Sequence, residues 1–249
     1  MLISDNGHKQ KTKFIKKNLI FLIFFAIVFV CFSIANVSAN TNTLNLSSLG
    51  DSYIDQHNPS TNYGSNWHMY VNPKNNQEEK LLIIFNLNSL PSNIIVNSAN
   101  LYIFLGSDVP SSSRTHNIYK ITSSWTESEV KWSNQPSISS SLTSSTNTGT
   151  TPFVWKNWDV TSDVQDFLSG AATNYGWEIK DNNETPSNNY NTLYRTREHP
   201  SNEQGGVTNP YLQINYVCES GWLGGNCSIP DCSSLNNCSG NGECVAPNN

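Results

Sequence analysis

Charged side chains are scarce in this 249-residue chain: Asp, Glu, Lys and Arg together make up 13% of it. Residues 1–39, which we predict to be cleaved (see below), contain five lysines and one aspartate. Their removal leaves 9 basic and 18 acidic side chains, a net charge near −9. A phosphate backbone is bound by a dense Lys and Arg surface. The composition therefore excludes nucleic acid as a partner.

Cysteine is absent between Cys31 and Cys218, so residues 40–217 must fold without a disulfide. That length is sufficient, because a domain of about 150 residues buries close to 70% of its unfolded surface. Aromatic residues make up 11% of the chain, which argues against disorder. About one residue in seven is Asn. We expect a folded domain with a polar, weakly charged surface.

Long apolar runs are lacking except for one near the start. Leu19 to Ala35 follows a lysine-rich stretch and precedes Val37 and Ala39, small residues typical of a cleavage site. We predict a signal peptide over residues 1–39, a secreted, extracellular mature chain, and no membrane span after cleavage. The alternative is an uncleaved anchor with its lysines in the cytoplasm, because about 17 apolar residues are near the lower limit for a span.

Four Asn-X-Ser/Thr sequons fit an extracellular protein, since such sites are glycosylated on secretion. They are centred at Asn45, Asn183, Asn226 and Asn237. Pro186 makes Asn183 a weak acceptor. We expect a glycoprotein.

Short β-branched and aromatic runs, divided by Asn, Ser, Pro and Gly turns, dominate residues 40–217. Most alternate between apolar and polar positions, as in antiparallel strands with one wet face. The run KLLIIFNL is apolar throughout and is predicted to be central. We predict strands at 67–72, 80–87, 98–106, 116–121, 153–160, 175–181, 192–198 and 211–217. The fold class is all-β: a jelly-roll-like antiparallel β-sandwich with a small disulfide-rich tail.

Three other segments interrupt the strands. Thr126 and Glu129 have the spacing of a capping box and indicate a short helix. Residues 161–170 carry a helical pattern of apolar positions that ends at a glycine. Residues 137–151 are rich in Ser and Thr and predict a mobile surface loop.

Six strings in a fixed order carry a family resemblance. They are DSYIDQHNPSTNYGSN (51–66), LLIIFNLNSLPSNIIVNSANLYIFL (81–105), SSWTESEVKWSNQPS (123–137), WDVTSDVQDFLSG (158–170), YGWEIK (175–180) and YRTREHP…NPYLQINY (194–216). Together they resemble the DNRLRE domain, a disaggregatase-related family that is also classed as a carbohydrate-binding module of the family 96 type. The resemblance implies that residues 40–217 form a β-sandwich of a kind found attached to enzymes or surface proteins that act on polysaccharides.

The tail resembles a second family. CESGWLGGNC (218–227) is similar to the last loop of an EGF-like module, and CSSLNNCSGNGEC (232–244) to the first three cysteines of a following one. The resemblance implies the end of one module over 218–231 and the start of a second over 232–249. The implied disulfides are Cys218–Cys227 and Cys232–Cys244. Five mature cysteines cannot all pair, so Cys238 is left without a partner, and we expect a truncated protein or an incomplete gene model.

A stripe of basic residues marks the predicted strand 192–198. Alternation along a strand would place Arg195, Arg197 and His199 on one face. Guanidinium groups bind carboxylates in a bidentate manner, so the stripe predicts a groove for an acidic polysaccharide. The alternative is structural, with Arg197 paired to an Asp or Glu of a neighbouring strand.

Tryptophans offer a second kind of sugar contact, because flat aromatic rings stack on sugar rings. Trp67 and His68, beside a polar loop, are the preferred candidates for a rim site. Trp125, Trp132 and Trp177 are predicted to be buried. Trp155 and Trp158 are three apart and point to opposite faces of a strand, so at most one of them is exposed.

Metal ligands are sparse. A calcium ion needs six to eight oxygen ligands, and the sequence leaves open a site that includes Asp51, Asp55 and Asn58. Zinc is not expected, because the histidines are scattered and the cysteines are assigned to disulfides. No other cofactor is predicted.

Catalytic motifs are missing as well: the chain has no G-x-S-x-G string and no phosphate loop. We predict a non-catalytic carbohydrate-binding protein of the cell surface or extracellular matrix, specific for an acidic polysaccharide. One alternative is a structural or adhesion protein that binds extracellular proteins through its EGF-like part. A polysaccharide lyase or hydrolase is the third hypothesis.

Overall fold

The structure is a computed structural model, and it describes residues 41–183, 190–200 and 207–231. The predicted signal peptide, Cys232, Cys238, Cys244 and Asn237 lie outside these residues. From Thr41 onward, the described residues belong to one compact unit. None of their helices is long and apolar enough to cross a membrane.

Strands dominate the described residues. They are β1 (Asn42–Asp55), β2 (His68–Val71), β3 (Glu79–Phe85), β4 (Ile94–Leu105), β5 (Thr115–Lys120), β6 (Ser144–Asn147), β7 (Val154–Asp159), β8 (Trp177–Asp181), β9 (Thr192–Arg195), β10 (Tyr211–Cys218), β11 (Trp222–Leu223) and β12 (Ile229–Pro230). Helix α2 covers Thr161–Ser169 and a 3-10 turn, η1, covers Trp132–Asn134. All eight predicted strands are present. The prediction missed β1, and it was wrong to make 137–151 entirely a loop, because this segment contains β6.

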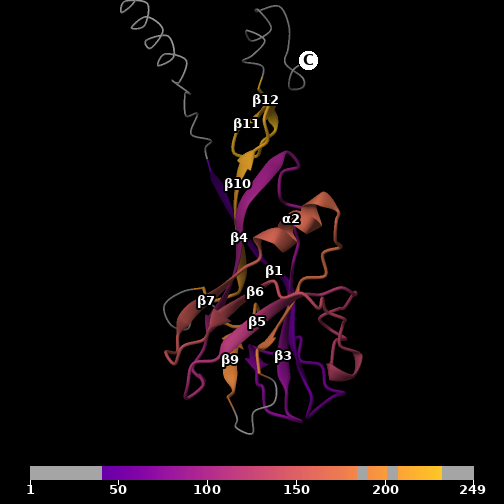
Figure 1. The fold of residues 1–249 in the computed structure, drawn as a ribbon, viewed down its shortest axis with the longest axis vertical. Helices are drawn as coiled ribbons and strands as arrows, with labels where there is room; N and C mark the ends of the chain where they lie inside the picture. The colour runs from indigo at the N-terminus through magenta and orange to yellow at the C-terminus, as the bar shows by residue number, and fades with distance from the viewer. Residues whose placement is uncertain (1–40, 184–189, 201–206, 232–249) are drawn as a thin grey trace, which may run out of the picture. The chain divides into compact units, whose positions relative to one another are not determined.

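The strands form two antiparallel sheets that share β1 (Figure 1). Sheet 1 contains β2, β9, β4, β10 and the first half of β1, and β7 pairs with β4. Sheet 2 contains the second half of β1 with β3, β8, β5 and β6. The register of β1 shifts between Ser48 and Gly50, and there the strand leaves sheet 1 and enters sheet 2. Such a local irregularity bends a strand.

One apolar cluster fills the space between the two sheets. Leu101 and Ile103 of sheet 1 belong to the same buried cluster as Leu81, Ile83 and Trp177 of sheet 2. Complete burial of one such side chain is worth roughly 1.5–3 kcal/mol. Strand β3 lies between β1 and β8, which confirms its predicted central position. The fold is therefore the all-β sandwich that the strand pattern predicted.

A second apolar cluster covers the other side of sheet 2. Ile54 and Leu82 are next to residues of the first core in their strands, so their side chains point to the opposite face of sheet 2, where they pack with Val130. Trp125 and Trp132 pack against this second cluster. Trp125 Nε1 donates to the backbone oxygen of Tyr175 at 2.8 Å. Residues 121–138 thus form a covering segment over sheet 2. Both of its tryptophans pack against the cluster, but they are half-buried rather than buried as predicted.

Helix α2 forms where the sequence predicts it. Val164 is buried, and the Phe167 ring lies 5.6 Å from that of Trp177. The helix ends at Gly170, whose φ of 76° is the left-handed conformation that glycine adopts most readily. The predicted capping box forms a turn over residues 127–129 rather than an α-helix: the Thr126 hydroxyl donates to Glu129 at 3.1 Å, and the 3-10 turn η1 follows at Trp132–Asn134.

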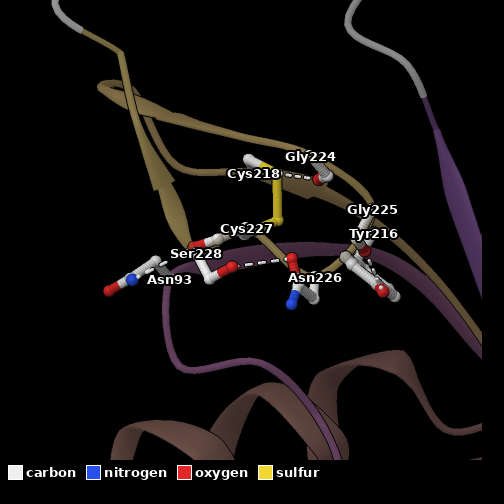
Figure 2. The surroundings of a disulfide bond; sticks show 8 residues. All are labelled: Asn93, Tyr216, Cys218, Gly224, Gly225, Asn226, Cys227 and Ser228. Atoms are coloured by element: carbon white, nitrogen blue, oxygen red, sulfur yellow. Dashed lines mark hydrogen bonds between the residues drawn. A yellow bond between two sulfur atoms is a disulfide. The ribbon is translucent and has the colours of Figure 1, made fainter.

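The predicted disulfide between Cys218 and Cys227 is present (Figure 2). Cys227 is 1% exposed and belongs to the core between the sheets. Asn93 Nδ2 donates to the Cys227 backbone oxygen at 3.3 Å, and the Tyr216 hydroxyl donates to the Gly225 oxygen at 2.8 Å. The disulfide loop therefore packs directly against the sandwich.

Candidate functional site

The outer face of sheet 1 carries aromatic and amide side chains. In β4, Leu101 and Ile103 point into the core, so Asn100 and Tyr102 point outward. The strand register places similar residues beside them on β1, β7 and β10. We call this surface the aromatic–amide face; it comprises Thr43, Asn45, Ser47, Ser98, Asn100, Tyr102, Phe104, Trp155, Asn157, Asp159, Tyr211, Gln213 and Asn215.

Four rings cluster at one end of the aromatic–amide face. Tyr102 and Tyr211 stack nearly parallel, with ring centroids 4.8 Å apart. The Trp155 ring meets Tyr211 at 5.1 Å and Phe104 at 5.3 Å, both edge to face. Trp155 keeps 36% of its surface exposed, whereas Trp158 is buried in the core, as the spacing of the two predicted. Trp155 is thus a solvent-exposed ring held in place by its neighbours.

Amide side chains occupy the rest of this face. Gln213 Nε2 donates to Asn45 Oδ1 at 3.3 Å, and Asn157 Nδ2 donates to Asn100 Oδ1 at 3.4 Å. Asn215 Nδ2 donates to the Ser98 hydroxyl at 2.9 Å. A carboxamide offers two N–H donors and an oxygen with two lone pairs, so these bonds use only part of the capacity of each group. The row can bond to further hydroxyl groups.

Four of the five predicted site residues meet at the β2–β9 end of sheet 1. His68 pairs in register with Arg195, and its ring lies 5.4 Å from that of His199. Trp67 comes directly before β2 and is 57% exposed. The structure therefore brings the predicted rim pair and two of the basic residues into one neighbourhood.

Arg195 connects this neighbourhood to the ring cluster. Its guanidinium lies 4.9 Å from the centre of the Phe104 ring, and its Nη1 donates to the Thr208 hydroxyl at 2.9 Å. The residue is only 3% exposed, so it packs on Phe104 at the end of the ring cluster with little contact to solvent. His199 is buried as well.

The predicted stripe on one face of a strand is wrong, because β9 ends at Arg195. The backbone turns there: Thr196 N donates to the Trp67 oxygen, and His199 N donates to the Thr196 oxygen, each at 3.3 Å. Arg197 consequently points elsewhere. Its guanidinium forms ion pairs with Glu127 and, at 2.8 Å, with Glu198, which is the structural alternative.

Arg197 lies in an acidic cluster that the sequence did not predict. Carboxylate oxygens of Asp51, Glu127 and Glu198 all lie within 4.8 Å of one another. Asp51 is fully buried and accepts from the Arg197 backbone N–H at 3.2 Å. Burial, together with the adjacent Glu198 carboxylate, raises the pKa of Asp51 to about 7. Desolvation also raises the pKa of Glu198. The cluster joins β1, the 126–129 turn and the segment after β9.

The residues predicted for calcium fall into two hydrogen-bonding groups. Asp51 belongs to the acidic cluster, where it also accepts from the Ser48 hydroxyl at 3.0 Å. Asp55 instead accepts from Asn58 Nδ2 at 2.5 Å and from the Tyr63 hydroxyl at 3.2 Å. A calcium site formed by all three residues stays a prediction.

Other titratable groups of the described residues serve the fold. His116 is fully buried, with Nδ1 3.0 Å from the Tyr194 hydroxyl, and burial lowers the pKa of His116 to about 4. Asp181 next to it accepts two hydrogen bonds from Arg114. Asp163 accepts from Trp177 Nε1 at 2.8 Å. All these carboxylates are occupied by internal partners.

A β-sandwich with one covered outer face and one open face of rings and amides has the features of a sugar-binding module. A family comparison agrees: the model of carbohydrate-binding module family 96 matches residues 42–216, from β1 to β10. The chain belongs to carbohydrate-binding module family 96. No curated protein matches the chain.

Proposed function

We propose that this protein is secreted, is non-catalytic and binds a polysaccharide across the aromatic–amide face. The observation that carries the proposal is the exposed Trp155 ring, held by Phe104 and Tyr211 beside a row of amides. Sugar rings present C–H groups that pack on an aromatic face, and their hydroxyls accept and donate hydrogen bonds. Both contacts are available on this one surface.

An acidic polysaccharide is the ligand class that we favour. Arg195, His68 and His199 lie next to the ring cluster, at the end of the face closed by β9. Cationic groups attract carboxylates and sulfates, and donate charge-assisted hydrogen bonds to them where they reach the surface. Arg195 and His199 are buried, so Arg195 contributes mainly its charge, and the half-buried His68 is the group that can contact a ligand. A polymer that stacks on Trp155 extends its acidic groups toward this end. Moderate salt weakens such binding, since exposed charges are screened over about 8–10 Å.

The proposal of a non-catalytic role rests on the carboxylates. Hydrolysis of a glycosidic bond uses two carboxyl groups about 5–10 Å apart, one on each side of the bond. In the described residues, the close acidic trio of Asp51, Glu127 and Glu198 surrounds Arg197, and Asp51 is buried. The trio is therefore arranged to hold the fold together rather than to flank a substrate.

A second candidate function is adhesion to other extracellular proteins through the EGF-like part. The observation that favours it is the β11–β12 hairpin of the disulfide loop, where Leu223 and Ile229 are largely exposed. These two apolar side chains are adjacent in register. In this case the sandwich is a spacer.

Binding to a panel of immobilised polysaccharides separates these functions. The panel contains neutral polymers (cellulose, xylan, mixed-linkage glucan) and acidic ones (polygalacturonate, alginate, chondroitin sulfate). Each mixture is also assayed for new reducing ends and for unsaturated products. Salt-sensitive binding to acidic polymers without turnover is the expected result. Turnover would establish an enzyme, and no binding to any polymer would favour adhesion.

Two variants locate the site. Trp155→Ala removes the exposed ring of the aromatic–amide face, and Trp67→Ala removes a more exposed ring that lies outside the ring cluster. We expect Trp155→Ala to weaken binding about ten-fold and Trp67→Ala to change it by less than about three-fold, because an aromatic contact is worth roughly 0.5–1.5 kcal/mol beyond the area that it buries. The opposite ranking would move the site to the β2–β9 edge.

A further inference from the structure

Asn45 belongs both to the aromatic–amide face and to a glycosylation sequon, Asn45-Leu46-Ser47. In β1, Leu46 points into the core, whereas Asn45 and Ser47 on either side of it are exposed. The acceptor amide and the sequon hydroxyl therefore both lie on the outer surface. A glycan attached here can be accommodated without disturbing the core.

The first half of β1 forms one edge of this face. Residues 42–47 pair with β10 alone among the described strands. Asn45 is in register with Gln213 of β10, which is in register with Asn100 of β4. The next outward-facing residue of β1, Ser47, is in register with Tyr211 of β10. Neighbouring strands are about 4.8 Å apart, so the three steps from β1 across β10 and β4 to β7 span about 14 Å. An oligosaccharide on Asn45 reaches the whole width of the face.

We propose that Asn45 is N-glycosylated and that its glycan occupies the aromatic–amide face, lowering the affinity of the protein for external polysaccharide. This inference rests on the proposed function, because it needs that face to bind sugar. The module would thus carry a tethered ligand of the same chemical class as its target. Removal or trimming of that glycan would expose the site.

The modification requires a donor oligosaccharide on a lipid pyrophosphate, the class of donor used in the secretory pathway. Asn45 Nδ2 attacks C1 of the first sugar. A C–N bond forms while the bond from C1 to the pyrophosphate oxygen breaks, Nδ2 loses one proton, and the lipid pyrophosphate leaves. The step involves no oxidation or reduction.

Tethering makes this competition effective even when the sugar binds weakly. A ligand on a short flexible linker reaches an effective concentration of about 1 mM. If the tethered glycan has an intrinsic dissociation constant of ~0.1 mM, it reduces the apparent affinity for a competing polymer about ten-fold. An attached glycan that matches the site poorly would have a smaller effect.

The other described sequons supply matched controls. Asn183 follows β8 of sheet 2, and Asn226 lies in the disulfide loop. Both side chains are exposed, as that of Asn45 is, but neither belongs to the aromatic–amide face. Glycans at these positions add the same mass and solubility without access to the ring cluster.

The test uses the full chain secreted from a host that performs N-glycosylation. Asn45→Gln removes the acceptor, and Ser47→Ala removes the sequon but keeps Asn45. Asn226→Gln is the control away from the face. Mass spectrometry gives the occupancy of each site, thermal unfolding confirms folding, and affinity is measured on polygalacturonate, alginate and chondroitin sulfate.

We expect Asn45 to be occupied, and we expect Asn45→Gln and Ser47→Ala to bind the acidic polymers about ten-fold more tightly than the wild type. Asn226→Gln should bind as the wild type does. An unoccupied Asn45 would overturn the inference, as would occupancy with no gain on its removal. In both cases binding itself persists, so the proposed function survives. If no form binds any polymer, the proposed function and the inference fail together.

Discussion

The two outer faces of this sandwich differ in what lies over them. Outside sheet 2, the covering segment 121–138 buries Ile54 and Leu82 beneath Val130 and two tryptophans. Outside sheet 1, the rings of Trp155 and its neighbours meet solvent. Both faces are rich in aromatic residues, so aromatic content alone does not mark a binding surface. What distinguishes them is whether another segment of the chain already occupies the rings.

The charged residues follow the same division. Arg197, Glu127 and Glu198 are paired with one another in the acidic cluster, whereas the open face is lined mainly by amides and rings, with Asp159 of β7 as its one carboxylate among the described residues. In a chain with so few charges, most cations of the described residues are engaged in stabilising the fold. Under the proposed function, we expect the aromatic–amide face to recognise shape and hydroxyl groups first, and acidic groups only at its β9 end.

The largest expected effect is the difference between alanine substitutions of the two tryptophans of β7. Trp158→Ala empties a core position and should destabilise the protein by about 3–5 kcal/mol, lowering Tm strongly. Trp155→Ala should leave Tm within a few degrees of the wild type while binding is lost. Circular-dichroism melting and polymer binding on both variants measure this. If Trp155→Ala proves as destabilising as Trp158→Ala, the ring cluster is part of the core and the comparison fails.

The disulfide loop is a third region of the molecule. Reducing its disulfide tests whether the stability of the sandwich depends on this loop as well as on the two sheets. Closing a loop of about ten residues stabilises a protein by roughly 2–3 kcal/mol, and Cys227 also fills part of the core. Residues 40–249 should therefore melt at a lower temperature in the presence of reductant, yet still cooperatively. Residues 40–217, which lack Cys218 and Cys227, should show no response. Loss of cooperativity in reductant would make the loop essential to the fold.

Arg197 and Arg195 sharpen the contrast between a folding role and a binding role. Arg197→Ala should cost about 1–2 kcal/mol, less than a fully buried pair would, since the Arg197 side chain is 39% exposed and its ion pairs are partly screened. Its affinity for acidic polymers should not change. Arg195→Ala, beside Phe104, should weaken that affinity. Equal affinities of both variants and the wild type would exclude the basic end of the face as part of the site.

The smallest effect is a dependence on pH. Because the pKa of Asp51 is raised to about 7, the folded state binds this proton more tightly than the unfolded chain. The resulting stability is complete below the ordinary Asp pKa near 4 and is lost as the pH rises through 7. Asp51→Asn should therefore gain stability relative to the wild type as the pH rises from 4 to 8.

His116 makes an opposing contribution to the pH dependence of stability, and this contribution cancels when the Asp51 variant is compared with the wild type. Burial lowers the pKa of His116 to about 4, so stability from the neutral imidazole is lost as the pH falls below about 6.5. This loss is common to both proteins and drops out of the difference in Tm. A difference in Tm that stays constant from pH 4 to pH 8 would contradict the raised pKa of Asp51.

Alternation of apolar and polar residues was sufficient to predict most of the eight strands, because these bury one face. Strand β3 was predicted from an uninterrupted apolar run, because both of its faces are buried. It failed for β1, whose first half is made mostly of Asn, Thr, Leu and Ser and has low intrinsic strand preference. It failed also for β6, a Ser/Thr stretch held by pairing with β5. In both cases backbone hydrogen bonds to a distant partner determine the structure.

The candidate site was less predictable than the fold. Tyr102, Trp155 and Tyr211 each lie in a predicted strand, but only the order β7–β4–β10 makes their rings meet, and strand order is not visible in local patterns. The stripe through Arg195 and Arg197 failed for the opposite reason. Alternation was extended past the end of β9, where contacts with Trp67 and Asp51 redirect the backbone.

The position of β10 has a consequence for the order in which the molecule assembles. This strand lies between β4 and the first half of β1, so Asn42 finds its partner only when Tyr216 has been synthesised. Pairings this distant along the chain fold slowly. Until then β4 presents an open edge from Ile94 to Tyr102, the kind of edge on which chains aggregate. A nascent chain interrupted before Tyr211 would therefore need a chaperone to shield that edge.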